Sequence, residues 1–183
     1  MNQEQLESSV EAAVTEGVRL RSEFYGALSE PDEQALGAPA TDADLSALAA
    51  LLGKPLPPSY AAFLKRFGAW KMFDPATDLL PARAIIDQAN SDALNRWRTI
   101  AIDTEGLQAD HWLLIGSSAA SASKYFIDPT RVDADGEMPV VEHDRVVAEE
   151  YSSFLQCLLE TNRQYKDGIE DIRSSDGLDF SNI

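Results

Sequence analysis

Residues 42–64, DADLSALAALLGKPLPPSYAAFL, decide the fold because they encode two short helices and the turn that joins them. Thr41 precedes this stretch and places a hydroxyl where it can accept a hydrogen bond from an otherwise unpaired helix amide. The first helix is expected to end at Gly53, because glycine readily takes the left-handed conformation that closes a helix. The Pro57–Pro58 pair then fixes the backbone for a second helix, which is expected to run to Gly68.

Longer helices are expected on both sides of this pair. Apolar residues three and four positions apart predict an amphipathic helix over about residues 3–28, with acidic residues on its other faces. Two prolines and a glycine in residues 30–40 predict a linker, so the first helix can form an arm separate from the core. After Pro81 the helical spacing continues to Trp97, which predicts one further helix.

The spacing of apolar residues changes from helical to strand-like in the second half of the chain. Short runs of aromatic and β-branched residues predict strands at 112–115, 124–127 and 138–141, and Leu79–Leu80 is a further candidate. Few residues separate these runs, which favours antiparallel pairing, because a parallel crossover needs a dozen or more. The fold class is therefore predicted as α+β, with a mostly antiparallel sheet flanked by helices.

The chain is expected to end in a helix and a tail. Apolar positions predict the last helix at about residues 152–165, and the acidic, turn-rich segment 167–183 is interpreted as poorly ordered or docked late. The predicted organisation is an N-terminal acidic helix with its linker (1–40), a core domain (41–166) and an acidic C-terminal tail (167–183).

The charge of the chain excludes several classes of function. Its 183 residues include 15 basic and 31 acidic ones, which leaves a formal net charge of −16. Binding to nucleic acid or to an anionic membrane surface requires a lysine- and arginine-rich footprint that this composition lacks, so neither partner is expected. The first 16 residues are acidic, whereas a signal peptide begins with basic residues and continues with apolar ones. No apolar run approaches the roughly 20 residues of a membrane span. A soluble, cytoplasmic protein is expected.

Few residues suggest chemistry, and no cofactor, metal or catalytic residue is expected. Cys157 is the single cysteine and lies on the apolar side of the last helix, where it is expected to pack as a small hydrophobe. His111 and His143 adjoin carboxylates, but neighbouring strand residues point to opposite faces of a sheet and cannot easily share one site. The serine-rich run 117–123 is expected to form a hairpin loop, and no nucleotide-binding glycine motif is present.

Partner-binding candidates fall into an aromatic and an acidic group. Trp70 and Phe73 lie in a predicted loop, where aromatic residues either anchor a partner or cover the edge of a core. Acidic residues are concentrated in positions 128–144, where Arg131 is the one arginine, and Arg145 follows directly after them. The acidic candidates are Asp128, Asp133, Asp135, Glu137, Glu142 and Asp144. Each can simply solvate the surface, whereas together they can steer a basic partner toward this part of the molecule.

Several motifs along residues 42–160 resemble those of the SUKH superfamily. The run LGKPLPPSY at 52–60, followed by Phe63–Leu64, is similar to the family's LG-x-x-LP-x-x-Y/F turn and the FL pair after it. Further along, KYFID at 124–128, PVV at 139–141 and SFL at 153–155 resemble its later strands and last helix. The usual Asn-Gly after the second helix is replaced here by a different sequence.

The resemblance implies a curved antiparallel sheet flanked by helices, and bacterial members that act as immunity proteins against a cognate toxin. Fungal relatives act in cell-wall regulation as interaction hubs, and neither branch has an established set of catalytic residues. The leading hypothesis is therefore a non-enzymatic immunity protein that covers the active site of a basic toxin, such as a nuclease. The alternatives are an interaction scaffold, recruiting partners through its acidic helix and tail, and an enzyme dependent on the two histidines.

Overall fold

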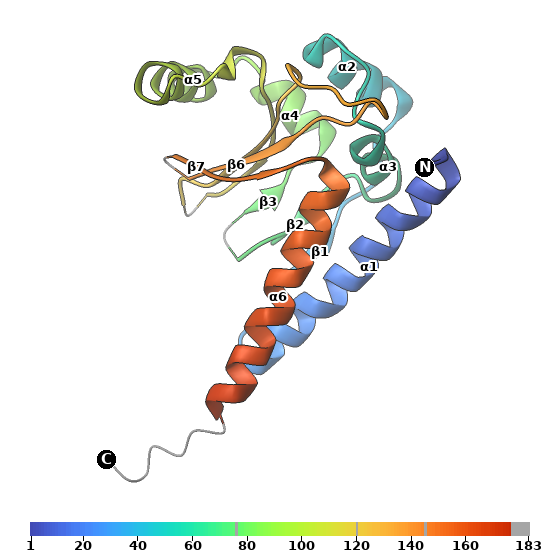
Figure 1. Cartoon of the computed structure of the whole chain (residues 1–183), viewed down its shortest axis with the longest axis vertical. Helices are drawn as coiled ribbons and strands as arrows, with labels where there is room; N and C mark the ends of the chain where they lie inside the picture. The colour runs from blue at the N-terminus through green and yellow to red at the C-terminus, as the bar shows by residue number, and fades with distance from the viewer. Residues whose placement is uncertain (76, 120, 145, 177–183) are drawn as a thin grey trace.

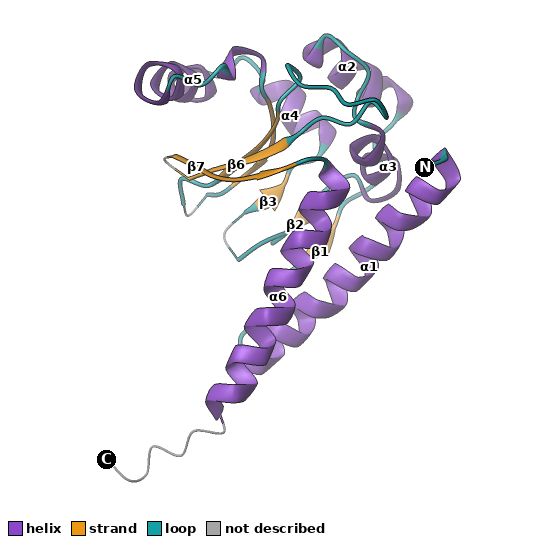
Figure 2. Cartoon of the chain, viewed as in Figure 1, coloured by secondary structure: helices purple, strands orange, loops and turns teal. Residues whose placement is uncertain are grey.

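The computed structural model describes residues 1–75, 77–119, 121–144 and 146–176 of the chain. Over these residues the strands form one seven-stranded sheet, in the order β1-β2-β3-β4-β5-β6-β7, in which every neighbouring pair is antiparallel. Figure 2 shows the strands in orange among the purple helices. The strands are β1 (Ala35–Leu36), β2 (Trp70–Lys71), β3 (Asp78–Leu79), β4 (Leu113–Ser117), β5 (Lys124–Ile127), β6 (Val140–Asp144) and β7 (Val146–Tyr151). The α+β class and the antiparallel pairing are confirmed.

Helices pack on both faces of this sheet. They are α1 (Gln3–Leu28), α2 (Asp42–Leu52), α3 (Pro58–Phe67), α4 (Ala82–Gln88), α5 (Asp92–Glu105) and α6 (Phe154–Asp176), with a short 3-10 helix η1 (Ala109–His111). Figure 1 shows α5 on the opposite side of the sheet from α1, α3 and α6.

The two short helices predicted from residues 42–64 form as their ends dictate. Thr41 accepts a hydrogen bond from the Asp44 amide, and the Asp44 side chain accepts one from the Thr41 amide, so α2 begins with a complete capping box. Gly53 closes α2 in the left-handed conformation, at φ 70°. Pro58 opens α3, whose aromatic side chains pack against Phe154 of α6. The helix predicted over residues 3–28 is also confirmed.

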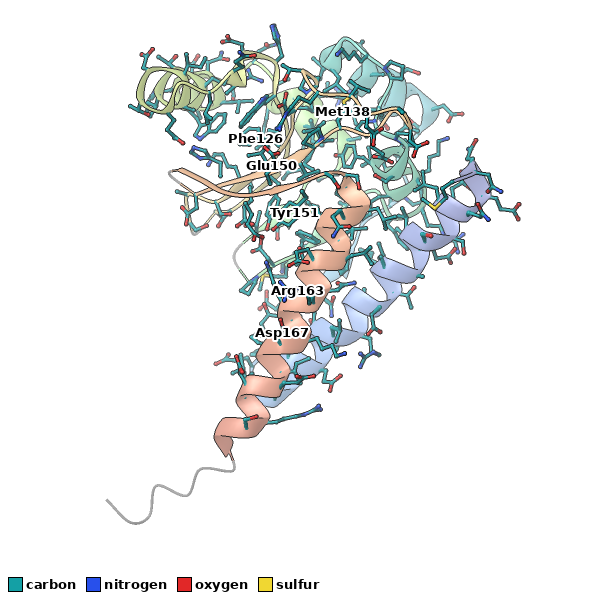
Figure 3. All side chains as sticks on the ribbon, in the orientation of Figure 1. Phe126, Met138, Glu150, Tyr151, Arg163 and Asp167 are labelled. Carbon is teal, nitrogen blue, oxygen red and sulfur yellow. The ribbon has the colours of Figure 1, made fainter. Side chains whose placement is uncertain are left out.

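Alternating side chains divide the core into two layers. On β5, Tyr125 and Ile127 join the main core beneath α1, α3 and α6. Phe126, between them, points to the other face, where it stacks on Trp97 of α5 with the two ring centroids 4.1 Å apart. Figure 3 marks Phe126 on the α5 side of the molecule and Tyr151 at the junction of β7 with α6. This alternation matters for the site, because it decides which face each residue of the sheet serves.

Helices α1 and α6 lie side by side and run in the same direction beyond the end of the sheet (Figure 1). Arg21 of α1 joins them, although its side chain is fully buried. Its guanidinium lies 4.2 Å from the ring centroid of Trp70 and 4.4 Å from that of Tyr165. Its Nε donates to the Phe73 carbonyl oxygen at 2.5 Å, and its Nη1 donates to Asn162 Oδ1 at 3.2 Å.

The helix expected from Pro81 to Trp97 is two helices. Residues 90 and 91 interrupt the pattern, and the Ser91 hydroxyl accepts a hydrogen bond from the Leu94 amide at 3.2 Å, so Ser91 begins α5 as an N-cap. The break lets the chain change direction and carry Trp97 to the second core layer. A helical spacing that persists across a cap residue therefore led to one helix being predicted where two occur.

The C-terminal part is more regular than expected. β7 follows β6 directly in the sheet and was not predicted, because its acidic residues at 149 and 150 break the apolar pattern. Helix α6 extends to Asp176, since Tyr165 and Ile169 continue its buried face against Leu20 of α1. Of the two expectations for the tail, poorly ordered or docked late, the first is thus wrong for residues 167–176, and residues 177–183 lie outside the described part of the chain.

Helix α1 belongs to the core rather than to a separate arm. Val10, Ala13 and Val14 are almost completely buried and form part of the main hydrophobic cluster. In the expected linker, β1 pairs with β2, which attaches residues 35 and 36 to the sheet. The composition change near residue 40 therefore does not mark a break in packing.

The close approach of α1 to its neighbours makes Gly17 and Gly26 a matched pair for testing. A Cβ atom at Gly17 would lie 2.6 Å from both Asn162 Oδ1 and Trp70 Cη2, whereas one at Gly26 would meet nothing within 4 Å. Gly17→Ala is expected to lower the free energy of unfolding by about 1–3 kcal/mol, because the packed core must shift. Gly26→Ala is expected to raise it by about 0.5–1 kcal/mol through helix propensity. Urea denaturation measures both, and a stabilised Gly17→Ala variant would contradict this account of α1.

Candidate functional site

The two aromatic candidates are core residues. The side chains of Trp70 and Phe73 are fully buried, and their ring centroids lie 5.5 Å apart. Phe73 also packs edge-to-face on Tyr125 of β5, and both rings contact the Arg21 guanidinium. Their side chains are therefore not available as exposed partner anchors, and the core-edge interpretation of this loop is the correct one.

Asp128, directly after β5, is buried and holds the start of the following loop through hydrogen bonds. One of its carboxylate oxygens accepts hydrogen bonds from the Thr130 amide at 2.9 Å and the Thr130 hydroxyl at 2.6 Å, and the other accepts one from Arg131 Nε at 2.9 Å. Burial alone would raise the pKa of Asp128, but these hydrogen bonds keep it below its ordinary value. Arg131 also donates two hydrogen bonds to the carboxylate of Glu150, which links the loop to β7.

Glu137 is half-buried and holds the other end of the same loop. Its carboxylate accepts hydrogen bonds from the Ser59 amide at 2.8 Å and the Ser59 hydroxyl at 2.7 Å, at the start of α3. The Ser59 hydroxyl in turn accepts a hydrogen bond from the Leu155 amide of α6 at 3.3 Å. Burial raises the pKa of Glu137 despite the Ser59 hydrogen bonds. The loop is thus attached to two helices as well as to the sheet.

Between these attachments, residues 133–136 form a tight turn that presents exposed acids. Asp133 Oδ1 accepts hydrogen bonds from the amides of Asp135 at 2.9 Å and Glu137 at 2.8 Å. Gly136 completes the turn at φ 83°, a conformation that favours glycine. The side chain of Asp135 is exposed at the tip. The turn is therefore held in one shape, with the side chain of Asp135 exposed to solvent.

Glu142 and Asp144 lie on β6, away from this turn. Glu142 accepts a hydrogen bond from the Tyr151 hydroxyl at 3.2 Å, on the main-core side of the sheet. His143, between them, points to the α5 side, and its Nε2 lies 2.9 Å from Glu105 Oε1 while its Nδ1 accepts a hydrogen bond from Trp97 Nε1 at 3.2 Å. Neighbouring residues of this strand do not share a site, as the alternation of side chains predicts. Asp144 is exposed at the end of the strand.

The remaining chemical candidates are Cys157, His111 and the serine-rich run 117–123. Cys157 is fully buried on α6, and burial raises the pKa of its thiol. His111 is exposed in η1. The Ser118 and Ser121 hydroxyls accept hydrogen bonds from backbone amides of the β4–β5 turn. Within the described residues, no three side chains of histidine, cysteine, aspartate or glutamate are grouped so that they could hold a metal ion. Nor is any helix in the described ranges long and apolar enough to cross a membrane.

A groove between α1, α3 and the acidic turn is the candidate site, and we name it the α1–α3 groove. It encloses about 400 Å³. Its lining residues are Met1, Gln3, Leu6, Glu7, Pro58, Ala61, Ala62, Lys65, Asp135 and Glu137. A second hollow of about 180 Å³ continues along the same two helices and shares Glu7, Ala62 and Lys65 with the first. Asp135 and Glu137 were expected here as acidic candidates, whereas the wall from α1 was not, because only the folded packing brings residues 1–7 beside them.

The carboxylates of the sheet respond to pH in opposite directions, which can be measured. Burial raises the pKa of Glu142, so its contribution to stability is complete below about pH 4.5 and is lost as the pH rises through the raised value. The hydrogen bonds from Arg131 lower the pKa of Glu150, so its contribution is present at neutral pH and is lost as the pH falls through the lowered value. At pH 7.5, Glu142→Gln is expected to raise the melting temperature and Glu150→Gln to lower it, each by about 2–4 °C or less. Thermal melts from pH 4 to pH 8 would refute this if the two variants shifted in the same direction at pH 7.5.

Comparison with known proteins assigns the central part of the chain to a protein family. Residues 39–160 match the model of the SMI1 / KNR4 family (SUKH-1), from just before α2 to the first turns of α6. A comparison with curated proteins gives no match. The matched segment contains α3 and the acidic turn, while α1 lies outside it. Because the match covers about two thirds of the chain, the protein belongs to the SMI1 / KNR4 family (SUKH-1).

Proposed function

We propose that this protein is an immunity protein that binds a cognate basic toxin and neutralises it by covering its active site or substrate groove. It does so without catalysis, in a stoichiometric complex. Membership of the SUKH family supports a role as an immunity protein or a related regulator. Fold alone does not assign a function, so the argument for the immunity role depends on the surface.

The observation that carries the proposal is the meeting of two acidic segments at one end of the molecule. Glu7 of α1, Asp135 of the acidic turn (residues 133–136) and Glu137 directly after the turn line the same groove, although Glu7 is about 130 residues from the other two in the chain. Glu4 and Glu11 extend the acidic face of α1 on either side of Glu7. A basic toxin surface complements this end of the molecule better than a neutral or acidic one.

Ion pairs within the protein leave most of its negative charge uncompensated. Several of its arginines are held by its own acids. They are Arg19, Arg66, Arg131, Arg163 and Arg173. With a net charge of −16, the remaining field attracts a positively charged partner and speeds its association.

A rigid surface suits inhibition by occlusion. The acidic turn is fixed at one end by Asp128 and at the other by Glu137, and α1 is fixed by the buried Arg21. Little ordering of these segments is then required on binding, so more of the contact energy remains as affinity. Such a surface can cover a toxin's substrate groove while the toxin itself stays folded.

Co-expression with a candidate toxin domain, taken from a gene adjacent to that of this protein, tests the proposal. Cells are expected to survive only when both proteins are present, and the two are expected to copurify at a 1:1 ratio. Toxin activity in vitro is expected to fall linearly as the protein is added and to reach its minimum at one equivalent. A chain of the same composition in scrambled order serves as the control for charge alone.

Other outcomes of this experiment discriminate among the alternatives. Protection at far less than one equivalent would favour an enzyme that inactivates the toxin. A stable complex without protection would favour the interaction scaffold. If the two proteins do not bind and the cells are not protected, the immunity proposal is refuted for this toxin–protein pair.

A further inference from the structure

We infer that the α1–α3 groove receives a basic amphipathic segment of the toxin, with an apolar side chain in the hollow and a lysine or arginine against its acidic rim. This inference rests on the proposed function and specifies the part of the surface that recognises the toxin. It also assigns a binding role to α1, which lies outside the segment matched by the family.

Small side chains on α3 create the hollow. Ala61 and Ala62 face Leu6 of α1 across the groove, and Pro58 closes one end near the acidic turn. Leu6 and Ala61 are half-buried, so apolar surface remains open to solvent in the unbound protein. The enclosed volume of about 400 Å³ lies within the range of pockets that bind ligands. An apolar side chain that enters it would remove this surface from water.

The charges around the hollow specify the flanks of the incoming segment. Glu7, Asp135 and Glu137 line the groove with a single lysine, Lys65. On the continuation of the groove, Glu11 already pairs with Arg66, Oε1 to Nη2, at 2.6 Å. Counted over the two hollows together, four acidic side chains stand against the two basic ones, Lys65 and Arg66, so a segment with lysine or arginine beside its apolar residue is favoured over an acidic one.

The groove is already formed in the unbound protein. Asn2 and Gln5 make a complete capping box at the start of α1, which keeps the first turn helical at the edge of the groove. Val10, one turn further, is buried in the main core and holds α1 against α3. On the opposite side, the bonds from Ser59 fix Glu137. Both walls therefore have defined positions before the partner arrives.

The origin of the walls suggests how specificity is divided. α3 and the acidic turn lie within the segment that matches the family, whereas Gln3, Leu6 and Glu7 come from α1 and Met1 lies just before it. A groove with one wall from the family domain and one from a helix outside the matched segment can vary its partner through α1 while the fold is retained. The toxin preference of this protein is thus expected to depend on residues near its N-terminus.

Filling the hollow is the direct test. Ala61→Trp is expected to weaken binding of the full-length protein to a catalytically inactive form of the cognate toxin at least tenfold, measured by isothermal titration calorimetry. Ala27→Trp is the matched control, because Ala27 is exposed near the other end of α1, about 30 Å away along the helix. The control is expected to bind as the unmodified protein does. Leu6→Asn, at a half-buried position, provides a second variant that removes the apolar wall if Ala61→Trp unfolds.

Changing the rim tests the charge part of the inference. Glu7→Gln combined with Asp135→Asn is expected to reduce the association rate several-fold at low salt and to weaken its dependence on salt concentration. The control with the same net charge is Glu30→Gln combined with Glu170→Gln, two exposed acids remote from the groove. Rates are measured by surface plasmon resonance between 50 and 500 mM salt.

The outcomes separate this inference from the proposed function. If the unmodified protein binds the toxin and folded Ala61→Trp and Leu6→Asn variants bind equally well, the groove is not the docking site, although the immunity role stands. If Ala27→Trp weakens binding as much as Ala61→Trp, the assignment to the groove is also wrong. If the unmodified protein does not bind the toxin at all, the proposed function fails and this inference fails with it.

Discussion

The buried guanidinium of Arg21 is the interaction on which the arrangement of the helices depends. It is enclosed by the rings of Trp70, Phe73 and Tyr165, and it donates hydrogen bonds to groups on the chain before β3 and on α6. Burial lowers the pKa of Arg21 to about 10, so the side chain remains charged at neutral pH even though its desolvation is costly. The aromatic faces and carbonyl oxygens offset this cost only when α1, α6 and β2 are all in place. The guanidinium therefore couples the position of α1 to the rest of the fold.

That coupling determines the geometry of the candidate site. Through Arg21, α1 contacts Trp70 of β2 and Asn162 of α6. Its first turns lie beside α3 and form a wall of the groove. Helix α1 has 26 residues and is about 39 Å long, so contacts near its C-terminal end also help to fix the position of its first turns. The acidic turn on the opposite wall is positioned independently, through Asp128 and Glu137. Both walls are thus built on the core, which explains how an N-terminal helix outside the family segment can take part in a well-defined surface.

Local signals predicted much of the fold, and long-range contacts decided the rest. Thr41, Gly53 and Pro58 act through neighbouring backbone groups, so α2 and α3 could be placed from the sequence. Strand β7 could not, because its acidic residues at 149 and 150 interrupt the apolar pattern, and the last turns of α6 could not, because they pack against α1, which is distant in the chain. The same distinction applies to the site. Sequence identified the acidic stretch that contains Asp135 and left two interpretations open for Trp70 and Phe73, of which burial in the core is the one observed. It did not identify the buried structural role of Asp128 or the wall contributed by Leu6.

Some acidic residues stabilise the fold, whereas others are exposed on the surface. The exposed ones are expected to affect how fast a partner binds, and the groove is expected to affect which partner binds. Asp128 and Glu137 are used by the fold, so the exposed tip at Asp135 and the face of α1 remain to attract a partner. Attraction by exposed charge is weakened by salt over about 8–10 Å and does not distinguish one basic protein from another. Burial of an apolar side chain in the hollow between Leu6 and Ala61 is not screened in this way and depends on shape. Net charge should therefore set how fast basic proteins arrive, whereas the groove should determine which of them stays bound.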